Sequence, residues 1–478
     1  MKIKTEQFKA VAKREMHNPS SRTFLNLLSV FILPQREKSM GTFPNPEATH
    51  RMGGIIREEA LSRLPELLEQ FETNAAKAGA RIFWAKDSRE ANDYILNLAR
   101  KNNVSYVTKG KSMVTEEMGL NEFLEKNGIR PYETDLGEFI TQLLDLPPFH
   151  IVGPAANVSP EEIRDVFMEK AGLEKPTNDP VELGYAARQY LRDKFLNMTM
   201  GITGVNFAIA ETGTIINVEN EGNIRFNKSS PKIQVSVMTL EKVLPVMKDA
   251  LHMLRLVSIN CTGQKIGTYV SMDTGPKNND EKDGPEELHI IIMDNGRSQL
   301  YQDVRARQIL QCIRCGGCLN ICPVFHIVGG YPYGWVYSGP MGQVLTPLLL
   351  GLSGCHDHIW ACTGCGACKA NCPAGVDHPR AFHYLRQMEA AGDKTLKAGS
   401  RPFAENMAYR AFGRMAASPL LWKVTSKAMR AVVNRGQTDG KIAKGPGPMS
   451  QWLQARDFPA MPEKTFHDVW KEMKAGRQ

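Results

Sequence analysis

Short apolar runs alternate with segments of helical periodicity over a long central stretch of the chain, residues 76–296. The runs that predict strands are 80–85, 104–108, 150–152, 214–218, 232–237 and 288–293. Apolar residues at helical spacing predict helices over 90–101 and 115–127. Strands and helices that alternate in this way fold as α/β domains, so we predict a mainly parallel sheet over 76–296.

The segments on either side of this stretch follow other patterns. Residues 1–75 have helical spacing and form a predicted lead-in. Residues 297–385 hold two runs of cysteine, and residues 386–478 are helical and basic, with a predicted break at 436–447. Within the α/β stretch, residues 272–285 have almost no apolar side chains and predict a surface loop. The predicted regions are therefore 1–75, 76–296, 297–385 and 386–478.

Composition narrows the class of protein. Of the 478 residues, 42% are hydrophobic and 23% are charged, as in an ordinary globular protein. The formal net charge is +8, the charged residues read as interspersed, and no nucleic-acid motif accompanies them. The apolar run 24–33 is too short to cross a bilayer, and the first residues do not lead into an apolar signal segment. We therefore expect a cytoplasmic protein. In that reducing compartment, cysteines bind metals or take part in catalysis more often than they form disulfides.

Eight of the ten cysteines lie in two nearly identical phrases, which form a clear internal repeat. The first phrase is Cys312, Cys315, Cys318 and Cys322, the second is Cys362, Cys365, Cys368 and Cys372, and a proline follows each. Thiolates at every third residue can wrap three corners of a cubane cluster while backbone N–H groups turn toward the sulfurs. Glycines in both phrases permit the positive φ that such a loop needs; they are Gly316, Gly317, Gly364 and Gly366.

The fourth cysteine of each phrase follows the pattern of two-cluster ferredoxins, in which it crosses to the other cluster. We therefore predict two [4Fe-4S] clusters: cluster 1 on Cys312, Cys315, Cys318 and Cys372, and cluster 2 on Cys322, Cys362, Cys365 and Cys368. A pair of zinc sites is the alternative, but zinc motifs usually bring paired cysteines from well-separated segments around one ion. The spacer 323–361 is long and partly apolar, which favours a helical ferredoxin-like module over a compact bacterial ferredoxin.

Two cysteines lie outside the phrases. Cys355 precedes the second phrase, and it is an alternative cluster ligand, a residue that helps to tune a cluster potential, or a partly buried spare thiol. Cys261 follows an apolar helix and reads as a structural thiol.

Several phrases together carry a family likeness. Residues 313–323, 342–351 (Gly-Gln-Val-Leu-Thr-Pro-Leu-Leu-Leu-Gly) and 362–373, with the upstream phrases 109–117, 133–138, 210–214 and 294–298, resemble the lactate utilisation protein B family. The likeness runs in order over residues 75–478. It is more specific than the cysteines alone, which many electron carriers share.

The resemblance implies a subunit of a bacterial complex that oxidises L-lactate to pyruvate, so that lactate can serve as a carbon source. The implied role is iron-sulfur electron transport within an oxidoreductase, with catalysis shared among subunits. The implied partners are a cysteine-rich subunit and a smaller subunit with the same α/β domain, called LUD-type, and the implied ligand is L-lactate or another small carboxylate. The fold of that domain is similar to CoA transferases and formyltetrahydrofolate cyclo-ligases.

Three residues of the α/β stretch are candidates for chemistry. Lys111 lies in a strand-to-helix turn, 109–112, which is either an anion site on backbone N–H groups or an ordinary turn with solvated lysines. Glu138 and Glu211 lie beside glycines, where they could act as bases, bind a polar ligand, or cap helices and turns. Residues 220–225 read as a hairpin turn.

Two other functions stay open on the sequence: an electron carrier for a different oxidoreductase, and a ligand-binding regulator whose clusters sense redox state. No Gly-x-Gly-x-x-Gly fingerprint precedes a helix, so a flavin or other redox cofactor would be held in another way or by a partner. The basic C-terminal region carries Trp422, Trp452 and Trp470. It could pack on the cluster region, dock a partner, or touch the inner face of the membrane.

Overall fold

The structure, a computed structural model, describes residues 3–399, 402–443, 445, 450, 452–454 and 456–476. Internal contacts divide the chain into two compact units, 1–399 and 400–478. The first unit holds two sheets of six and four strands, and the second holds a small sheet of three.

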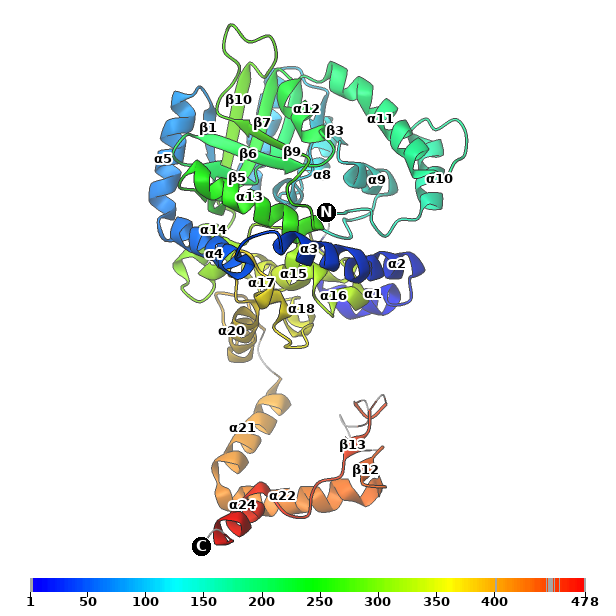
Figure 1. Ribbon diagram of the computed structural model, residues 1–478, viewed down its shortest axis with the longest axis vertical. Coiled ribbons are helices and arrows are strands. Elements are labelled where there is room, and N and C mark those ends of the chain that lie inside the picture. Colours follow the sequence, from blue (N-terminus) through cyan, green and yellow to red (C-terminus); the bar gives the residue numbers. More distant parts are fainter. Residues whose placement is uncertain are drawn as a thin grey trace. The chain divides into compact units, whose positions relative to one another are not determined.

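A six-stranded, wholly parallel sheet forms the centre of the first unit, in the order β1-β10-β7-β4-β2-β3 (Figure 1). Its strands are β1 Arg81–Ala85, β2 Tyr106–Lys109, β3 Arg130–Glu133, β4 Met200–Gly204, β7 Ile233–Thr239 and β10 Glu287–Met293. Successive residues of β10 belong to different hydrophobic cores, Ile290 and Ile292 to one, Ile291 and Met293 to the other. Both faces of the sheet are therefore covered, as parallel sheets require. The predicted mainly parallel α/β domain is confirmed.

A second sheet, in the order β8-β5-β6-β9, was not predicted. Its strands are β5 Phe207–Ile209, β6 Thr214–Glu219, β8 Val243–Leu244 and β9 Tyr269–Asp273. Strand β6 pairs antiparallel with β5 and β9, and β5 pairs parallel with β8. Strand β9 takes the first two residues of the predicted surface loop 272–285.

Three predictions of local structure are wrong. Residues 150–152 form bends rather than a strand, and the buried His150 ring lies 3.1 Å from Asn320 Oδ1. The helix predicted over 115–127 is two helices, α7 Met113–Glu117 and α8 Leu120–Lys126, because Gly119 takes a φ of +64° between them. The predicted hairpin at 220–225 is instead a turn from β6 into helix α12, Asn223–Ser229.

The other helices of the α/β region begin at residues that suit helix starts. They are α6 Ser88–Lys101, α9 Leu136–Leu144, α10 Pro160–Lys170, α11 Pro180–Asn197 and α13 Met247–Thr262. Asp87 accepts the N–H groups of Arg89 and Glu90 at the start of α6. Ser159 and Glu162 form a reciprocal capping box at the start of α10.

The N-terminal helices do more than precede the α/β region, because several of them pack on the cysteine region. They are α1 Phe8–Glu15, α2 Pro19–Leu27, a π-helical turn Leu28–Ile32, α3 Leu33–Met40, α4 Pro46–Ser62 and α5 Leu64–Lys77. Phe8 meets Tyr333 edge to face at 5.3 Å, and the Arg22 guanidinium donates to the His326 carbonyl oxygen at 2.7 Å. Figure 1 shows α1, α2 and α4, in blue, beside the helices of the cysteine region, whereas α5 lies along the α/β region next to β1.

Short helices make up the cysteine region. They are α14 Arg297–Gln302, α15 Gly317–Asn320, α16 Phe325–Val328, α17 Gly339–Leu350, α18 His356–Trp360, α19 Ala367–Ala370 and α20 His378–Ala391. Helices α15 and α19 occupy the same place in the two cysteine phrases, and each starts after a glycine of positive φ, Gly316 or Gly366. The sequence repeat is therefore also a structural one.

The second unit has no buried residue on its three described long helices, α21 Phe403–Ala417, α22 Pro419–Val433 and α24 Phe466–Ala475. Its small sheet is β11 Gln437–Thr438, β12 Lys441–Ile442 and β13 Phe458–Pro459. Two of these strands fall in the predicted break 436–447, of which residues 444, 446 and 447 lie outside the described residues. Residues 400–478 contain 14 Lys and Arg but only 6 Asp and Glu, so the net charge of +8 falls on them and the charges are not interspersed as predicted.

Candidate functional site

The eight predicted ligand thiols lie in two groups. Group one is Cys312, Cys315, Cys318 and Cys372, and group two is Cys322, Cys362, Cys365 and Cys368. The thiol of Cys372 interacts electrostatically with the three group-one thiols of the other phrase, and that of Cys322 with the three group-two thiols of the other phrase. All ten cysteines are free of disulfides. Each group thus combines three thiols of one phrase with the fourth thiol of the other.

The backbone of both phrases suits a cluster-binding loop. Gly316 and Gly364 have φ of +73° and +74°, a region that favours glycine. The N–H groups of Gly364 and Val376 donate to the sulfurs of Cys362 and Cys372 at 3.3 and 3.4 Å. Such bonds stabilise thiolate charge and tune cluster potentials. Four gathered thiols with backbone donors fit a [4Fe-4S] cluster in each group, and such a cluster, when bound, supplies one-electron transfer.

The two groups differ in their access to solvent. Cys315 of group one is 8% exposed, and its neighbour Gly317 is packed against Asn260. Cys365 of group two is exposed, and a Cβ built on Gly364 would meet no atom within 4 Å. Group two therefore has an open side.

Positive side chains surround group one. Arg314 donates to Glu241 Oε1 at 3.0 Å and to the Cys312 carbonyl oxygen at 3.2 Å. The fully buried Arg57 of α4 donates to the carbonyl oxygens of the two residues before Cys312, at 3.0 Å each. Burial lowers the pKa of Arg57 to about 10 and that of Lys242 to about 8. These cations offset the negative charge that four thiolates would bring.

A cavity of about 470 Å³ lies between the parallel sheet and group one. Its sheet side includes Lys111, Asn206 and Lys242, which follow the carboxyl ends of β2, β4 and β7, and its other side includes Arg314 and Cys315. Strands β2 and β4 are neighbours whose onward connections run in opposite directions, to β3 and to β7. Open α/β sheets bind ligands at such a switch point, beyond the carboxyl ends of the strands.

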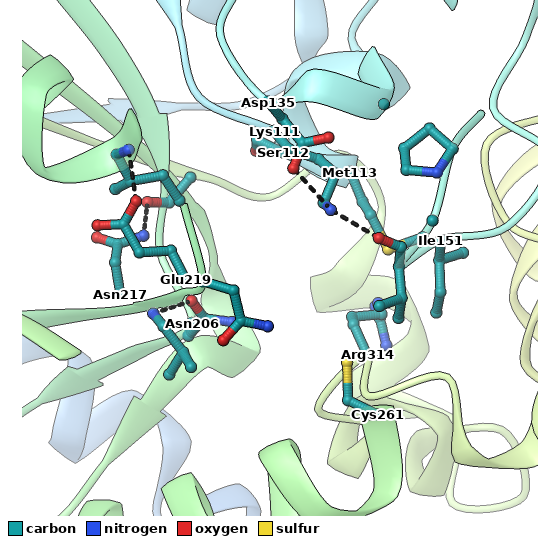
Figure 2. A pocket seen from close by; sticks show the side chains of 18 of the residues that line it. Lys111, Ser112, Met113, Asp135, Ile151, Asn206, Asn217, Glu219, Cys261 and Arg314 are labelled. Carbon is teal, nitrogen blue, oxygen red and sulfur yellow. Dashed lines mark hydrogen bonds and ion pairs between the residues drawn. The ribbon is translucent and has the colours of Figure 1, made fainter. Parts of the chain in front are cut away.

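Most polar side chains around the cavity already have partners. Figure 2 shows Lys111 and Asp135 across the cavity from Glu219. Lys111 Nζ donates to Asp135 Oδ2 at 3.0 Å and to the Val152 carbonyl oxygen at 2.9 Å. Glu219 accepts the N–H of Ile224 at 2.7 Å, so it caps α12. These groups shape the walls more than they offer free binding atoms.

The two cysteines outside the phrases have different surroundings. Cys261 lies near the end of α13 and lines the cavity, with Lys111 and Cys315 as electrostatic neighbours. Burial raises the pKa of Cys261 to about 11, so its thiol is neutral. Cys355 is 1% exposed, and its thiol hydrogen-bonds with Thr5 of the N-terminal segment. The surroundings of Cys355 are those of a buried spare thiol.

Only one of the three candidate catalytic residues, Lys111, lines the cavity. Its turn leads into α7, which has only five residues, and the Ser112 hydroxyl accepts the Thr115 N–H there. Glu211 accepts the N–H of Met247, the first residue of α13, at 3.3 Å, as the capping interpretation expected.

The third candidate, Glu138, belongs to a carboxylate cluster with the buried Glu133 and the partly exposed Glu116, and their oxygens lie within 4.8 Å of one another. Lys109 Nζ lies 2.9 Å from Glu116 and 2.7 Å from Glu133. Burial, together with the two neighbouring carboxylates, raises the pKa of Glu138 well above its ordinary value. Because Lys109 already supplies the cation, the cluster reads as a structural ion network.

Family models match the chain in three consecutive segments. A LUD domain covers residues 68–293, a 4Fe-4S dicluster domain covers 308–376, and the C-terminal domain of lactate utilisation protein B covers 385–475. The dicluster match contains all eight predicted ligand cysteines. The chain is thus an iron-sulfur protein that joins a LUD domain to a dicluster domain.

Curated relatives match over almost the whole length. The lactate utilization protein B of Bacillus licheniformis is 40% identical over 99% of this chain and 98% of its own, and that of Bacillus subtilis is 40% identical over 98% and 96%. The protein of the same name from Anoxybacillus flavithermus is 39% identical over 99% of both chains. The chain belongs to the lactate utilization protein B family.

Proposed function

We propose that this chain is the iron-sulfur electron-transfer subunit of a complex that oxidises L-lactate to pyruvate. The observation that carries the proposal is the arrangement of the thiols in groups one and two, which would hold clusters 1 and 2 respectively. Because each group takes its fourth thiol from the other phrase, the clusters would lie side by side. Each takes up one electron at a time, so the pair can store the two electrons that lactate releases. The name of the relatives points to lactate as the electron donor.

The same proposal gives the electrons a direction. Cys315 of group one lines the cavity, so electrons would enter at cluster 1. Cys365 of group two is exposed, so they would leave at cluster 2. The proposed partners are a cysteine-rich subunit and a smaller LUD-domain subunit, one of which docks over Cys365. A flavin, if the complex uses one, belongs to a partner, and catalysis is shared with it.

Two finer fold assignments belong to this proposal: a CoA transferase-like LUD domain and a ferredoxin-like dicluster domain. No helix in the described part of the chain is long and apolar enough to cross a membrane. The C-terminal unit is proposed to bring the complex to the inner membrane surface. Its net positive charge and the exposed apolar side chains of α21, α22 and α24 support that role.

The experiment is anaerobic. The purified chain should carry about eight irons, as two [4Fe-4S] clusters require. L-lactate is then added while cluster absorbance is followed, first with the chain alone and then with its co-purifying subunits. Bleaching only with the subunits is the expected result. Bleaching by the chain alone would show that catalysis needs no partner, and no bleaching in either case would mean that another donor supplies the electrons.

A further inference from the structure

The cavity between the LUD domain and the dicluster domain has the features of a ligand site rather than a packing gap. It lies at the switch point between β2 and β4, and its volume of about 470 Å³ falls within the range of roughly 300–1,000 Å³ of small-molecule pockets. Cys315 forms part of its wall. A bound molecule would therefore touch the polypeptide that holds cluster 1.

One cation of the cavity wall forms no direct ion pair. Lys111 is paired with Asp135, and Arg314 is paired with Glu241. Among the described residues, the Lys242 ammonium forms no hydrogen bond or ion pair, although it lines the cavity and is only partly exposed. Glu241 and Cys312 are its attractive electrostatic neighbours, but neither contacts it directly, so the ammonium can still accept a negatively charged ligand.

Uncommitted polar groups lie on the neighbouring strand ends. The Thr239 hydroxyl, at the end of β7, has no hydrogen-bond partner in the described part of the chain. Asn206 follows β4, and its Oδ1 accepts the Val218 N–H at 3.0 Å, which leaves its amide N–H groups as donors. An oxygen substituent next to a carboxylate would find these groups beside Lys242.

The acidic side chains of the cavity limit the charge of the ligand. Three carboxylates, Asp135, Glu219 and Glu221, also line the cavity. Asp135 is already paired with Lys111, so a phosphate with two negative charges would meet Lys242 together with the carboxylates of Glu219 and Glu221, and they disfavour it. A carboxylate with a single charge matches the one ammonium that forms no direct ion pair.

We propose that this cavity binds 2-hydroxy and 2-oxo carboxylic acids, with the ligand carboxylate on Lys242 and its 2-oxygen near Thr239 and Asn206. The site rests on the proposed function and deepens it by naming the substrate class. The cavity is far larger than lactate, so acids with longer side chains, such as 2-oxobutyrate, bind as well as pyruvate does. Lys242 is a substrate-binding residue in this arrangement, and the thiol of Cys261 is part of the wall.

The test measures binding rather than turnover. Oxamate, a 2-oxo carboxylate that cannot be oxidised as lactate is, is titrated calorimetrically into the anaerobic, cluster-loaded full chain. Lys242→Met should weaken binding by about tenfold or more, since a charge-assisted contact is lost, whereas Lys242→Arg should largely preserve it. The control is Lys248→Met, the same change at an exposed lysine of α13 outside the cavity. Thr239→Val replaces the hydroxyl with a methyl group and keeps the shape of the side chain, so it should also weaken binding. This variant is the test if Lys242→Met fails to retain its iron.

The possible results separate this proposal from the proposed function. If oxamate fails to bind, or binds equally well to Lys242→Met and wild type, the site is wrong even if the complex reduces its clusters with lactate. Inorganic phosphate binding that excludes oxamate would also overturn it. If oxamate binds through Lys242 but lactate never bleaches the clusters in the complex, the site stands and the lactate-oxidising role fails.

Discussion

The guanidinium of Arg297 donates two parallel hydrogen bonds to the carboxylate of Glu117, each 2.6 Å long, and both side chains are shielded from solvent. Arg297 is the first residue of α14 in the cysteine region, and Glu117 is the last residue of α7 in the LUD domain. The Tyr337 hydroxyl donates to the same carboxylate. One buried ion pair therefore joins the cysteine region to the LUD domain, the two parts of the chain that line the cavity.

Removing one partner of this pair should destabilise the protein strongly. Arg297→Met leaves the Glu117 carboxylate buried without its cation, which costs about 3–5 kcal/mol of unfolding free energy. Denaturant unfolding of the cluster-loaded protein, under anaerobic conditions, measures the change. Arg81→Met is the control, because Arg81 pairs with Glu287 at 2.7 Å on the surface, where such a pair contributes at most about 1 kcal/mol. Equal losses in the two variants would contradict the role of the buried pair.

Iron content after paired substitutions tests the crossed ligand sets. Cys312→Ala combined with Cys372→Ala removes two ligands of cluster 1, so about four of eight irons should remain. Cys312→Ala combined with Cys322→Ala removes a ligand from each cluster, and both clusters should be lost although the substitutions lie in one phrase.

The control for this pair of variants is Cys355→Ala. The Cys355 thiol lies against Thr5 rather than in either group, so this variant should keep all of its iron. The opposite pattern, with the single-phrase variant keeping half of its iron, would show that each phrase binds its own cluster. Electron paramagnetic resonance of the reduced protein reports which cluster remains.

The elements that the sequence predicted are those encoded locally. The cysteine spacing and its glycines set a loop that needs no distant partner, so both phrases could be recognised directly. Strand β10 carries the apolar run 290–293, and β7 has apolar residues at 233, 235 and 237, so both could be recognised as strands from the sequence. The predicted helix 115–127 was divided by Gly119, a residue that periodicity alone does not weigh.

The cavity could not be predicted, because it forms where distant segments meet. Lys242 follows a predicted strand but has no motif around it, and Cys261 looked like a packing residue. Arg57 lies in the segment predicted only as a helical lead-in, more than 250 residues before the carbonyl groups it binds. The short strands β5 and β8 have two or three residues each, too few to show a period.

The protonation of Glu138 should make stability depend on pH. Its pKa is raised by burial first and then by Glu116 and Glu133, so the folded protein holds a proton that the unfolded chain releases. The stability associated with this group is present in full below its unfolded pKa of about 4.5 and is lost as pH rises through the folded pKa. Glu138→Gln copies the neutral form and should escape that loss.

The measurement for Glu138 is the thermal unfolding midpoint of wild type and variant over a series of pH values. The midpoint of Glu138→Gln should rise relative to wild type as the solution becomes more alkaline. Glu125→Gln, the same change at an exposed position of α8, is the matched control. Parallel curves for Glu138→Gln and wild type would mean that Glu138 is already ionised in the folded protein.

The positive charge of the C-terminal unit should produce binding to anionic lipid. Lys423 and Lys427 lie four residues apart on α22, on the same side of the helix, and the apolar Leu420 and Val424 of that helix are 71% and 59% exposed. Each lysine near an anionic membrane contributes about 1 kcal/mol, so Lys423→Gln with Lys427→Gln should weaken vesicle binding by roughly tenfold or more. Co-sedimentation of the full chain with phosphatidylserine-containing vesicles, at rising salt, measures this binding.

The control pair is Lys101→Gln with Lys126→Gln, at exposed positions of the first unit, and this variant should bind as wild type does. If binding survives high salt and both pairs of substitutions, or is equal on neutral vesicles, the exposed apolar residues bind the membrane without help from the charge. If no binding is seen, this surface belongs to a partner subunit instead.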